Sequence, residues 1–544
     1  MLPVIAFLKG FFSRKDVSII CFILAIVTKT LLTFYFLQLD NDKLFQAMAG
    51  KNLSEGHGFT LEQVHANNLS KNYYEPFIGW PPGYSVLVAI IYSLVKDLNV
   101  SCFIIDVICI ILFFILLRTL LRQLEFPEYL INLLVLFNGS TITIYIIQST
   151  PTDFLAFLLI VYNCYLSIAL FRQKKPRLQG MLLLVFNILP AWFRYMYIPV
   201  TFIIPGFLLW NGWFKKDRKL LLHGVYAMGL AIISVIVLLG FRAPFEPVEY
   251  IAISEKGIFW GNLLQITPAL FTAFMDGNFF TVQLSQLTGV PYKKWAIIFQ
   301  RAHLIPFLLL LMLLFYSSFK KRFLAADSWQ VFRMIGVLMA LTIFFVLAFL
   351  SLTHNMNYPP PRDLIWTYVS ADRYYIFIEF FFVLVAVKWL FMNDITASGL
   401  KNLARVLFLF LFAVGIVHGT YFTFKNFSSE KKNFADKTSE NAVVHYIENT
   451  IRENKKKNID VVVTGHTSMA NMSILMGGKG LFESSELNTK TISADKPTKL
   501  VLVIQNAQFP FYSQFFRKEG QKLETKINEF YLYSYYIKPN TLSN

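Results

Sequence analysis

Five ionisable residues stand at or near the ends of long apolar runs, where chemistry is expected in a membrane protein. Asp40 and Asp42 follow the first apolar run directly, and Asp153 lies between the third and fourth runs. Arg194 ends another run, and Arg373 stands just before a late one. A carboxylate can accept a proton, and a guanidinium can bind two phosphate oxygens at once. The sequence therefore offers proton acceptors and anion binders at a membrane surface.

Four of these five positions also have a purely structural interpretation. Asp40 and Asp42 can be the solvated start of a loop. Asp153, with Thr152, can cap the N-terminus of a helix. Arg373 can anchor a helix end by extending its charged group to the membrane interface.

The composition indicates that many apolar helices must position these residues. Of the 544 residues, 56% are hydrophobic and 15% are charged, whereas a soluble domain is about 45–50% apolar and about 25% charged. A helix needs roughly 20 apolar residues to cross the bilayer, and about 11 runs approach that length. They are residues 17–39, 101–121, 129–147, 154–171, 180–193, 196–212, 221–240, 302–319, 334–352, 374–392 and 404–423.

The first run and the pair 180–212 differ from the other runs. The first is longer than a signal-peptide core and no small-residue cleavage site follows it, so we expect it to remain as a span. Pro190, Arg194 and Pro199 interrupt the pair 180–212, which makes these two spans the weakest assignment. The four cysteines all lie inside apolar runs and are expected to be small core residues: Cys21, Cys102, Cys109 and Cys164.

The basic residues behind the net charge of +17 are concentrated in the connections between the apolar runs. Basic clusters occur at every second connection: Arg118 and Arg122, Arg172 to Arg177, Lys215 to Lys219, Lys320 to Arg333, and Lys401 with Arg405. The positive-inside rule then places the N-terminus in the cytoplasm and the C-terminal tail outside. The richness in Lys, Asn and Phe favours a bacterial inner or plasma membrane. Because topology accounts for the basic excess, nucleic acid is not an expected partner.

Three connections on the outer side are too long to be turns: Asp40 to about Val100, Arg242 to Arg301, and the tail from about Lys425. In the first, Pro82–Lys96 is apolar but short, so we expect a juxtamembrane or re-entrant helix. The tail contains strand-like runs at Asp460–Thr464, Lys499–Gln505 and Glu529–Ile537. The predicted fold is an all-α polytopic membrane domain of about 11 helices over residues 1–424. A small extracytoplasmic α/β domain follows over residues 425–544.

Several short motifs occur one after another along residues 1–425. They are an Asp after the first span, Asn52–Phe59 (NLSEGHGF), Tyr73–Glu75 (YYE), Trp80–Tyr84 (WPPGY), Thr150–Leu155 (TPTDFL), Trp192–Tyr195 (WFRY) and Ala371–Tyr374 (ADRY). This set resembles the GT-C glycosyltransferases, and in particular the bacterial dolichyl-phosphate-mannose–protein mannosyltransferase and lipid A aminoarabinose transferase group. Asp42 stands at the usual distance before Gly56, so it matches the family's loop-one Asp, with Asp40 as the alternative register.

The resemblance implies an integral-membrane enzyme that moves a hexose or pentose from a polyprenyl-phosphate donor to an extracytoplasmic acceptor. The acceptor can be a glycan, a lipid or a protein. Asp42 or Asp40 would be the base, with Asp153 orienting the sugar or acceptor. The implied substrate-binding residues are Arg373, Tyr374, Arg194, Glu75, Tyr74 and His354. Inversion at the anomeric carbon is implied. No cofactor is assigned with certainty, and the Asp-Asn-Asp run could hold a divalent metal ion, as in the metal-dependent oligosaccharyl branch.

Two other functions fit the composition. A transporter or flippase of lipid-linked sugars would place ionisable residues near the middle of the membrane, on broken helices. The candidate acids here lie instead at the outer interface beside long loops. A membrane-anchored scaffold whose tail binds a partner is the third possibility, and the tail has no motif that distinguishes it.

Overall fold

The protein is described by a computed structural model, which divides into two compact units. The structure describes residues 10–35, 41–77, 79–140, 151–172, 176–242, 284–291, 294–295, 312, 315–316, 328–353, 374–392, 399–435, 439–482, 486–505, 515, 523–527 and 530–539. One unit is helical and comprises residues 1–36, 78–83 and 103–424. The other is a mixed α/β unit comprising residues 37–77, 84–102 and 425–544. The first long loop therefore belongs to the same compact unit as the C-terminal tail.

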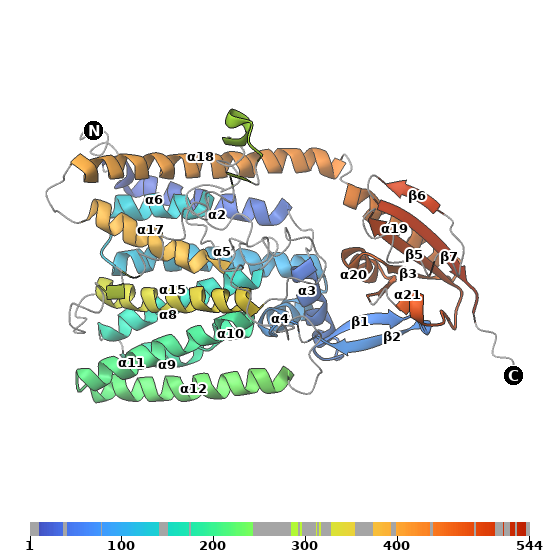
Figure 1. Ribbon diagram of the computed structural model, residues 1–544, viewed down its shortest axis with the longest axis horizontal. Helices are drawn as coiled ribbons and strands as arrows, with labels where there is room; N and C mark the ends of the chain where they lie inside the picture. Colours follow the sequence, from blue (N-terminus) through green and yellow to red (C-terminus); the bar gives the residue numbers. More distant parts are fainter. Residues whose placement is uncertain are drawn as a thin grey trace. The chain divides into compact units, whose positions relative to one another are not determined.

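The helical unit is a bundle of long apolar helices (Figure 1). Its helices are α2 (Lys15–Tyr35), α5 (Leu98–Gln123), α6 (Glu128–Ser140), α8 (Pro151–Phe171), α9 (Pro176–Phe186), α10 (Leu189–Phe193), α11 (Ile203–Phe214), α12 (Arg218–Arg242), α15 (Ser328–Thr353), α17 (Ile376–Phe391) and α18 (Gly399–Ala435). The first five residues of α5 and residues 425–435 of α18 belong to the other unit. Most of the predicted spans 17–240 and 334–423 lie in these helices, whereas span 302–319 falls almost wholly outside the described residues.

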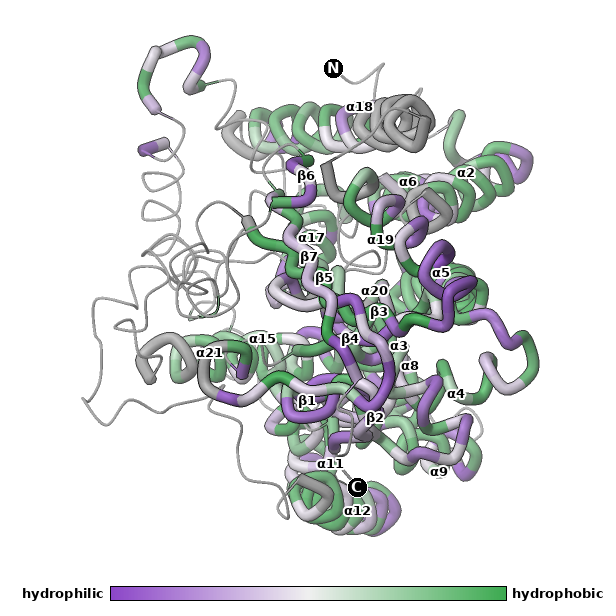
Figure 2. Tube along the Cα trace, turned by 90° about the vertical axis from the view of Figure 1, so that its right-hand side faces the viewer, coloured by the Kyte–Doolittle hydropathy of each residue, from purple (hydrophilic) through white to green (hydrophobic). Residues whose placement is uncertain are grey.

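Six segments of the described chain are long and apolar enough to cross a membrane: Leu98–Gln123, Thr152–Phe171, Tyr195–Phe214, Arg218–Gly240, Ser328–Phe349 and Asn402–Tyr421. The predicted number of about 11 spans is therefore supported only in part. On α12 and α18, large apolar side chains such as Ile236 and Val417 are more than 60% exposed. Figure 2 shows the hydrophobic colouring along these helices. Lipid is the solvent that such faces require, so the chain is a membrane protein.

Small and polar residues let the spans pack closely. A Cβ atom on Gly139 of α6 would lie 2.7 Å from Ala25 of α2, so glycine permits this approach. Two turns earlier on each of these helices, the Ser18 hydroxyl donates to the Asn132 side-chain oxygen at 3.0 Å. The four cysteines are free and buried, as predicted.

The predicted interruption of the 180–212 region is confirmed. Helix α9 ends at Phe186, α10 covers only Leu189–Phe193, and two 3₁₀ turns, η1 (Tyr195–Tyr197) and η2 (Pro199–Phe202), precede α11. Proline favours the first turn of a new helix and cannot continue an old one. Arg194 occupies the break itself, with extended backbone angles of φ −151° and ψ 121°.

The mixed α/β unit contains a five-stranded sheet in the order β4-β3-β5-β7-β6. Strand β3 pairs in parallel with β4 and β5, while β7 pairs antiparallel with β5 and β6. The elements are α19 (Ser439–Lys455), β3 (Asp460–Thr464), α20 (Thr467–Leu475), β4 (Lys479–Leu481), α21 (Glu486–Thr489), β5 (Thr498–Gln505), β6 (Leu523–Ile527) and β7 (Phe530–Ile537). The predicted α/β character of the tail is thus confirmed.

The first long loop completes this unit. It folds into α3 (Asn41–Ser54), the antiparallel hairpin β1 (Thr60–His65) and β2 (Asn68–Pro76), and α4 (Gly83–Val95). Val64 and Leu69 of the hairpin are buried in one apolar cluster with residues of β3 and β5. Helix α4 has 13 residues, too few to cross about 30 Å of hydrocarbon, which agrees with the short helix predicted for Pro82–Lys96.

The orientation of the chain can be tested with single cysteines, because the four native cysteines are buried. Lys219 lies at the basic α11–α12 connection, and Lys456 follows α19 in the tail; both side chains are exposed. In intact cells or oriented vesicles, we expect an impermeant maleimide to label Lys456→Cys immediately and Lys219→Cys only after permeabilisation. The opposite labelling pattern would contradict the predicted topology.

Candidate functional site

The most buried ion pair of the candidate residues joins Asp153 to Arg194. The Arg194 Nε atom lies 3.0 Å from Asp153 Oδ1; the carboxylate side chain is 0% exposed and the arginine side chain 13%. Two charges removed from water to this extent are stable only when each compensates the other. Asp153 lies in the first turn of α8, and Arg194 lies in the break between α10 and η1.

Tyr374 contributes the third side chain of this cluster. The Arg194 Nη2 atom donates to the Tyr374 hydroxyl at 3.3 Å, and the guanidinium carbon lies 5.6 Å from the centroid of the tyrosine ring. Phe157, one turn after Asp153 on α8, contacts Phe380 of α17, with ring centroids 5.4 Å apart. Three residues predicted from distant parts of the sequence therefore meet in the helical unit.

The WPPG segment packs against the same break. Gly83 lies so close to the Trp192 carbonyl that a Cβ atom there would be 2.5 Å from the oxygen. The Tyr195 hydroxyl lies 3.5 Å from the Trp80 carbonyl oxygen, at the long limit of a hydrogen bond. Glycine is required at position 83 because no side chain fits this approach. Four of the motifs thus gather around Arg194.

Asp42 lies in the mixed α/β unit, in the first turn of α3, and is partly buried. The next residues of this helix are held by packing: Phe45 stacks on Phe77, with centroids 6.2 Å apart, and contacts Phe482 at 5.9 Å. The Ser85 hydroxyl of α4 donates to the Gln46 carbonyl at 2.8 Å. The helix that carries Asp42 is therefore fixed by side chains from the hairpin end, α4 and the C-terminal part of the chain.

Glu75 and Tyr74 point to opposite faces of β2. Glu75 Oε1 lies 2.7 Å from His65 Nε2. The Tyr74 ring stacks on His57 with centroids 3.9 Å apart and planes at 10°. Partial burial, together with the carboxylates of Glu62 and Glu55, raises the pKa of Tyr74, so its hydroxyl stays protonated at neutral pH. Tyr74 therefore offers an exposed aromatic face and a hydrogen-bond donor.

Three of the predicted site residues lie outside the described residues, namely Asp40, His354 and Arg373. Nor do the described residues bring three or more His, Cys, Asp or Glu side chains together in a metal-binding group. Asp153 is already engaged by Arg194. The described side chains therefore do not supply a ligand set for the divalent ion that the Asp-Asn-Asp run could hold.

Three buried ionisable residues inside the predicted spans were not among the predicted site residues. Lys29 of α2, Asp106 of α5 and Glu379 of α17 are each 2% exposed. Their signal was present in the sequence, since charged residues within apolar runs are rare and are a default functional hypothesis. Glu379 lies one turn after Tyr375, and its N–H donates to the Tyr375 carbonyl at 2.9 Å.

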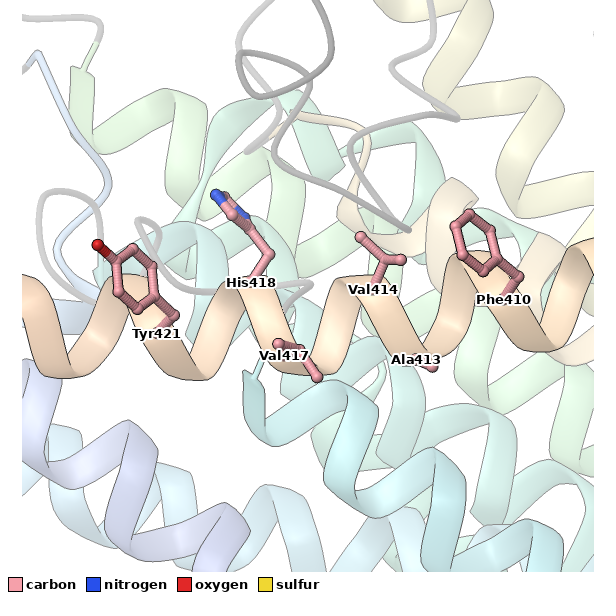
Figure 3. Close-up of a pocket in the computed structure, with 6 residues that line it drawn as sticks. All are labelled: Phe410, Ala413, Val414, Val417, His418 and Tyr421. Carbon is pink, nitrogen blue, oxygen red and sulfur yellow. The ribbon is translucent and has the colours of Figure 1, made fainter. Parts of the chain in front are cut away.

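A groove of about 370 Å³ lies along α18, lined by Phe410, Ala413, Val414, Val417, His418 and Tyr421. Figure 3 shows Phe410, Val414 and His418 projecting from the same side of the helix. None of the predicted site residues that the structure describes lines this groove. Its walls are almost wholly apolar, as expected for a surface in contact with acyl or prenyl chains.

Comparison with known proteins found no matching protein-family model and no matching curated protein. Solved structures do show similarity. ArnT from Cupriavidus metallidurans, bound to undecaprenyl phosphate, is 10% identical with a TM-score of 0.48, covering 96% of this chain and 98% of its own. The oligosaccharyltransferase AglB from Archaeoglobus fulgidus, in complex with an inhibitory peptide and a dolichol-phosphate, is 11% identical with a TM-score of 0.46, covering 92% and 70%.

An Archaeoglobus fulgidus oligosaccharyltransferase in complex with Zn and sulfate is 10% identical, with a TM-score of 0.43 and coverage of 92% of this chain and 69% of its own. All of these are GT-C proteins. They belong to the superfamily that the motifs of this chain resemble. At these TM-scores the similarity carries no argument about function, which therefore depends on the residues of this chain.

Proposed function

We propose that the protein is an integral-membrane glycosyltransferase that moves a sugar from a polyprenyl-phosphate donor to an extracytoplasmic acceptor. The observation that supports this most strongly is the cluster of Asp153, Arg194 and Tyr374. These residues come from three separate motifs of the GT-C resemblance and meet around one guanidinium. A guanidinium held by a carboxylate on one side presents its remaining N–H groups in a fixed direction, which suits a phosphate.

The proposed reaction is a displacement at the anomeric carbon. Asp42 takes the proton of the acceptor hydroxyl as its oxygen attacks that carbon. A new glycosidic bond forms, the bond to the lipid phosphate oxygen breaks, and the configuration inverts. The leaving polyprenyl phosphate gains negative charge, which Arg373 and Arg194 stabilise. The proton removed from the acceptor ends on Asp42, so atoms and charge balance without a further reactant.

Other residues are assigned to substrate binding. Asp153 holds Arg194 through its Nε atom and orients the sugar or the acceptor beside it. Tyr374 packs on the guanidinium and accepts a hydrogen bond from its Nη2 atom. Tyr74, Glu75 and His354 bind the acceptor side, for which Tyr74 offers an exposed ring. If Asp40 takes the place of Asp42, the same chemistry applies two residues earlier.

A transfer assay tests this proposal. Purified protein in lipid vesicles is incubated with polyprenyl-phosphate sugars and acceptors extracted from the membranes of the source cell. The expected products are free polyprenyl phosphate and a glycosylated acceptor in equal amounts. Donor that stays intact under every condition would refute the assignment. Adding EDTA tests metal dependence in the same assay; because the mechanism above contains no metal step, we expect the rate to be unchanged.

A flippase of lipid-linked sugars is the second candidate, and a specific observation favours it. Lys29, Asp106 and Glu379 are buried within spans, where transporters place ionisable residues. A flippase would move labelled donor across the bilayer without breaking the bond between sugar and phosphate. The same vesicles therefore separate the two functions by the chemical state of the donor.

Arg373 provides a further prediction for donor binding. We expect Arg373→Ala to weaken binding of undecaprenyl phosphate by roughly 10- to 100-fold, the equivalent of one charged hydrogen bond, and to slow transfer as well. Arg373→Lys should be impaired, because it keeps the charge and loses the planar fork. Titration of purified variants with undecaprenyl phosphate measures this. Arg405→Ala is the control. Arg405 lies near the start of α18, and its Nε atom donates to the Leu390 carbonyl of α17. Equal affinities in all variants would leave Arg373 as a helix anchor.

A further inference from the structure

The tip of the β1–β2 hairpin is attached to the C-terminal part of the chain by a buried carboxylate. Glu486 of α21 is 3% exposed. Its Oε2 atom accepts the backbone N–H of Ala66 at 2.8 Å, in the turn between β1 and β2. Its Oε1 atom lies 3.2 Å from His65 Nδ1 and also contacts the Lys490 ammonium.

This carboxylate is charged at neutral pH. Burial by itself would raise the pKa of Glu486, but hydrogen bonds from Lys490, the Ala66 N–H and His65 outweigh it, and the pKa lies below its ordinary value. His65 faces a second carboxylate through its other ring nitrogen, since Nε2 lies 2.7 Å from Glu75 Oε1. The Tyr73 ring meets His65 edge-on at 4.7 Å. His65 is thus fixed between the hairpin and α21.

Backbone and surface contacts reinforce the attachment. The Leu69 N–H donates to the Ser493 carbonyl at 2.9 Å, and the Ser493 N–H donates to the Ala66 carbonyl at 3.0 Å. The Asn68 amide donates to Asp495 at 2.8 Å. Lys479, which pairs with Asp460 of β3, also donates to the Ser70 carbonyl at 2.5 Å. Glu486 differs from these other contact residues because its carboxylate is buried and accepts a hydrogen bond from the backbone of the turn.

The base of the same hairpin holds α3. The Asn52 amide of α3 donates to the Thr60 carbonyl at 2.9 Å, and the His57 N–H donates to the Asn52 carbonyl at 2.9 Å. Phe77, directly after β2, stacks on Phe45 one turn after Asp42. A continuous set of contacts therefore runs from Glu486 through the hairpin to the helix that carries Asp42, all within one compact unit.

We propose that Glu486, acting with His65, is a positioning residue that fixes the hairpin and thereby sets Asp42 for proton transfer. This inference rests on the proposed function, because it gives the C-terminal domain a role in the same reaction. A small displacement of a catalytic group can lower the rate by up to about 100-fold. Loss of Glu486 should therefore lower kcat while the KM for the donor stays unchanged.

The test compares Glu486→Ala and Glu486→Gln with Glu524→Ala. Glu524 is a matched control in the same sheet domain: its side chain is 35% exposed and pairs with Lys499 at 2.8 Å. Melting temperatures show whether each variant is folded. Hydrogen exchange of residues 41–77 reports the hairpin and α3 directly. We expect faster exchange and a kcat about 10- to 100-fold lower in Glu486→Ala, with Glu524→Ala close to wild type in both.

A cross-link then separates positioning from any other role of Glu486. The Ser493 hydroxyl contacts the Asn67 carbonyl at the surface, so Asn67→Cys with Ser493→Cys brings two thiols close enough to be tested as a disulfide. In the Glu486→Ala background, this disulfide should restore slow exchange and kcat together, and a reductant should reverse both.

Two results would overturn the proposal. One is equal exchange and kcat in Glu486→Ala and Glu524→Ala. The other is a disulfide that restores slow exchange while kcat stays low. If the wild type itself transfers no sugar, the proposed function is wrong, and the exchange comparison still shows separately whether Glu486 fixes the hairpin and α3.

Discussion

Asp42→Asn should yield folded, membrane-inserted protein whose transfer rate is lower by about 10²- to 10⁴-fold, the usual effect of removing a positioned general base. Asparagine keeps the size and hydrogen bonding of the side chain but cannot accept the acceptor proton. Asp42 lies in the first turn of α3, where a change of charge alone leaves the packing of Phe45 and Gln46 intact. The initial rate of polyprenyl phosphate release measures the effect.

Two further variants make this result specific. Glu62→Gln removes a carboxylate from β1, in the same unit, and should leave the rate near that of the wild type. Asp40→Asn tests the alternative register. An inactive Asp40→Asn beside a normal Asp42→Asn would move the base to Asp40, and normal rates in both would remove this loop from the chemistry.

Arg194→Ala should both destabilise the helical unit and abolish transfer. The substitution removes the guanidinium that pairs with the fully buried Asp153 carboxylate. Breaking a buried pair from one side costs about 3–5 kcal/mol. We expect a clear fall in the melting temperature of the purified variant. Arg172→Ala is the control, because its partner Glu125 is 68% exposed and an exposed pair contributes about 0–1 kcal/mol.

The double variant Asp153→Leu with Arg194→Met separates stability from function. Replacing both members of a buried pair by apolar side chains of similar size is often neutral or stabilising. We therefore expect the melting temperature to recover while transfer stays absent. A double variant with wild-type transfer would show that the pair only supports the fold, and the phosphate-binding assignment of Arg194 would be wrong.

The sequence predicted the helices well where hydropathy alone determines them. Apolar length and Pro190, Arg194 and Pro199 were enough to place the long spans and the break at Arg194. The same reasoning placed β3, β5 and β7, because runs such as Asp460–Thr464 are rich in β-branched residues. Motif resemblance selected Asp153, Arg194 and Tyr374 as candidates, but their meeting around one guanidinium was not predicted.

Elements that depend on tertiary contacts were not predicted. Strands β1 and β2 were treated as loop, because their mixed polar sequence pairs only when Val64 and Leu69 pack into the core formed with the tail. Strand β4 begins within the glycine-rich segment Gly477–Gly480, a composition that favours a turn over a strand. Gly477 does turn, with φ of +83°, but Gly480 lets β4 approach α20: a Cβ atom there would lie 2.9 Å from the Ala470 carbonyl.

The central claim is that the bond between the sugar and its lipid phosphate is broken and the sugar is transferred to an acceptor. Mass spectrometry of donor and acceptor, in vesicles containing either wild type or Asp42→Asn, measures this directly. The account predicts that the wild type converts donor to free polyprenyl phosphate with an equal gain of sugar on the acceptor, and that Asp42→Asn does so at least about 100-fold more slowly. Donor that reaches the opposite leaflet with its sugar still attached, equally in both proteins, would contradict it.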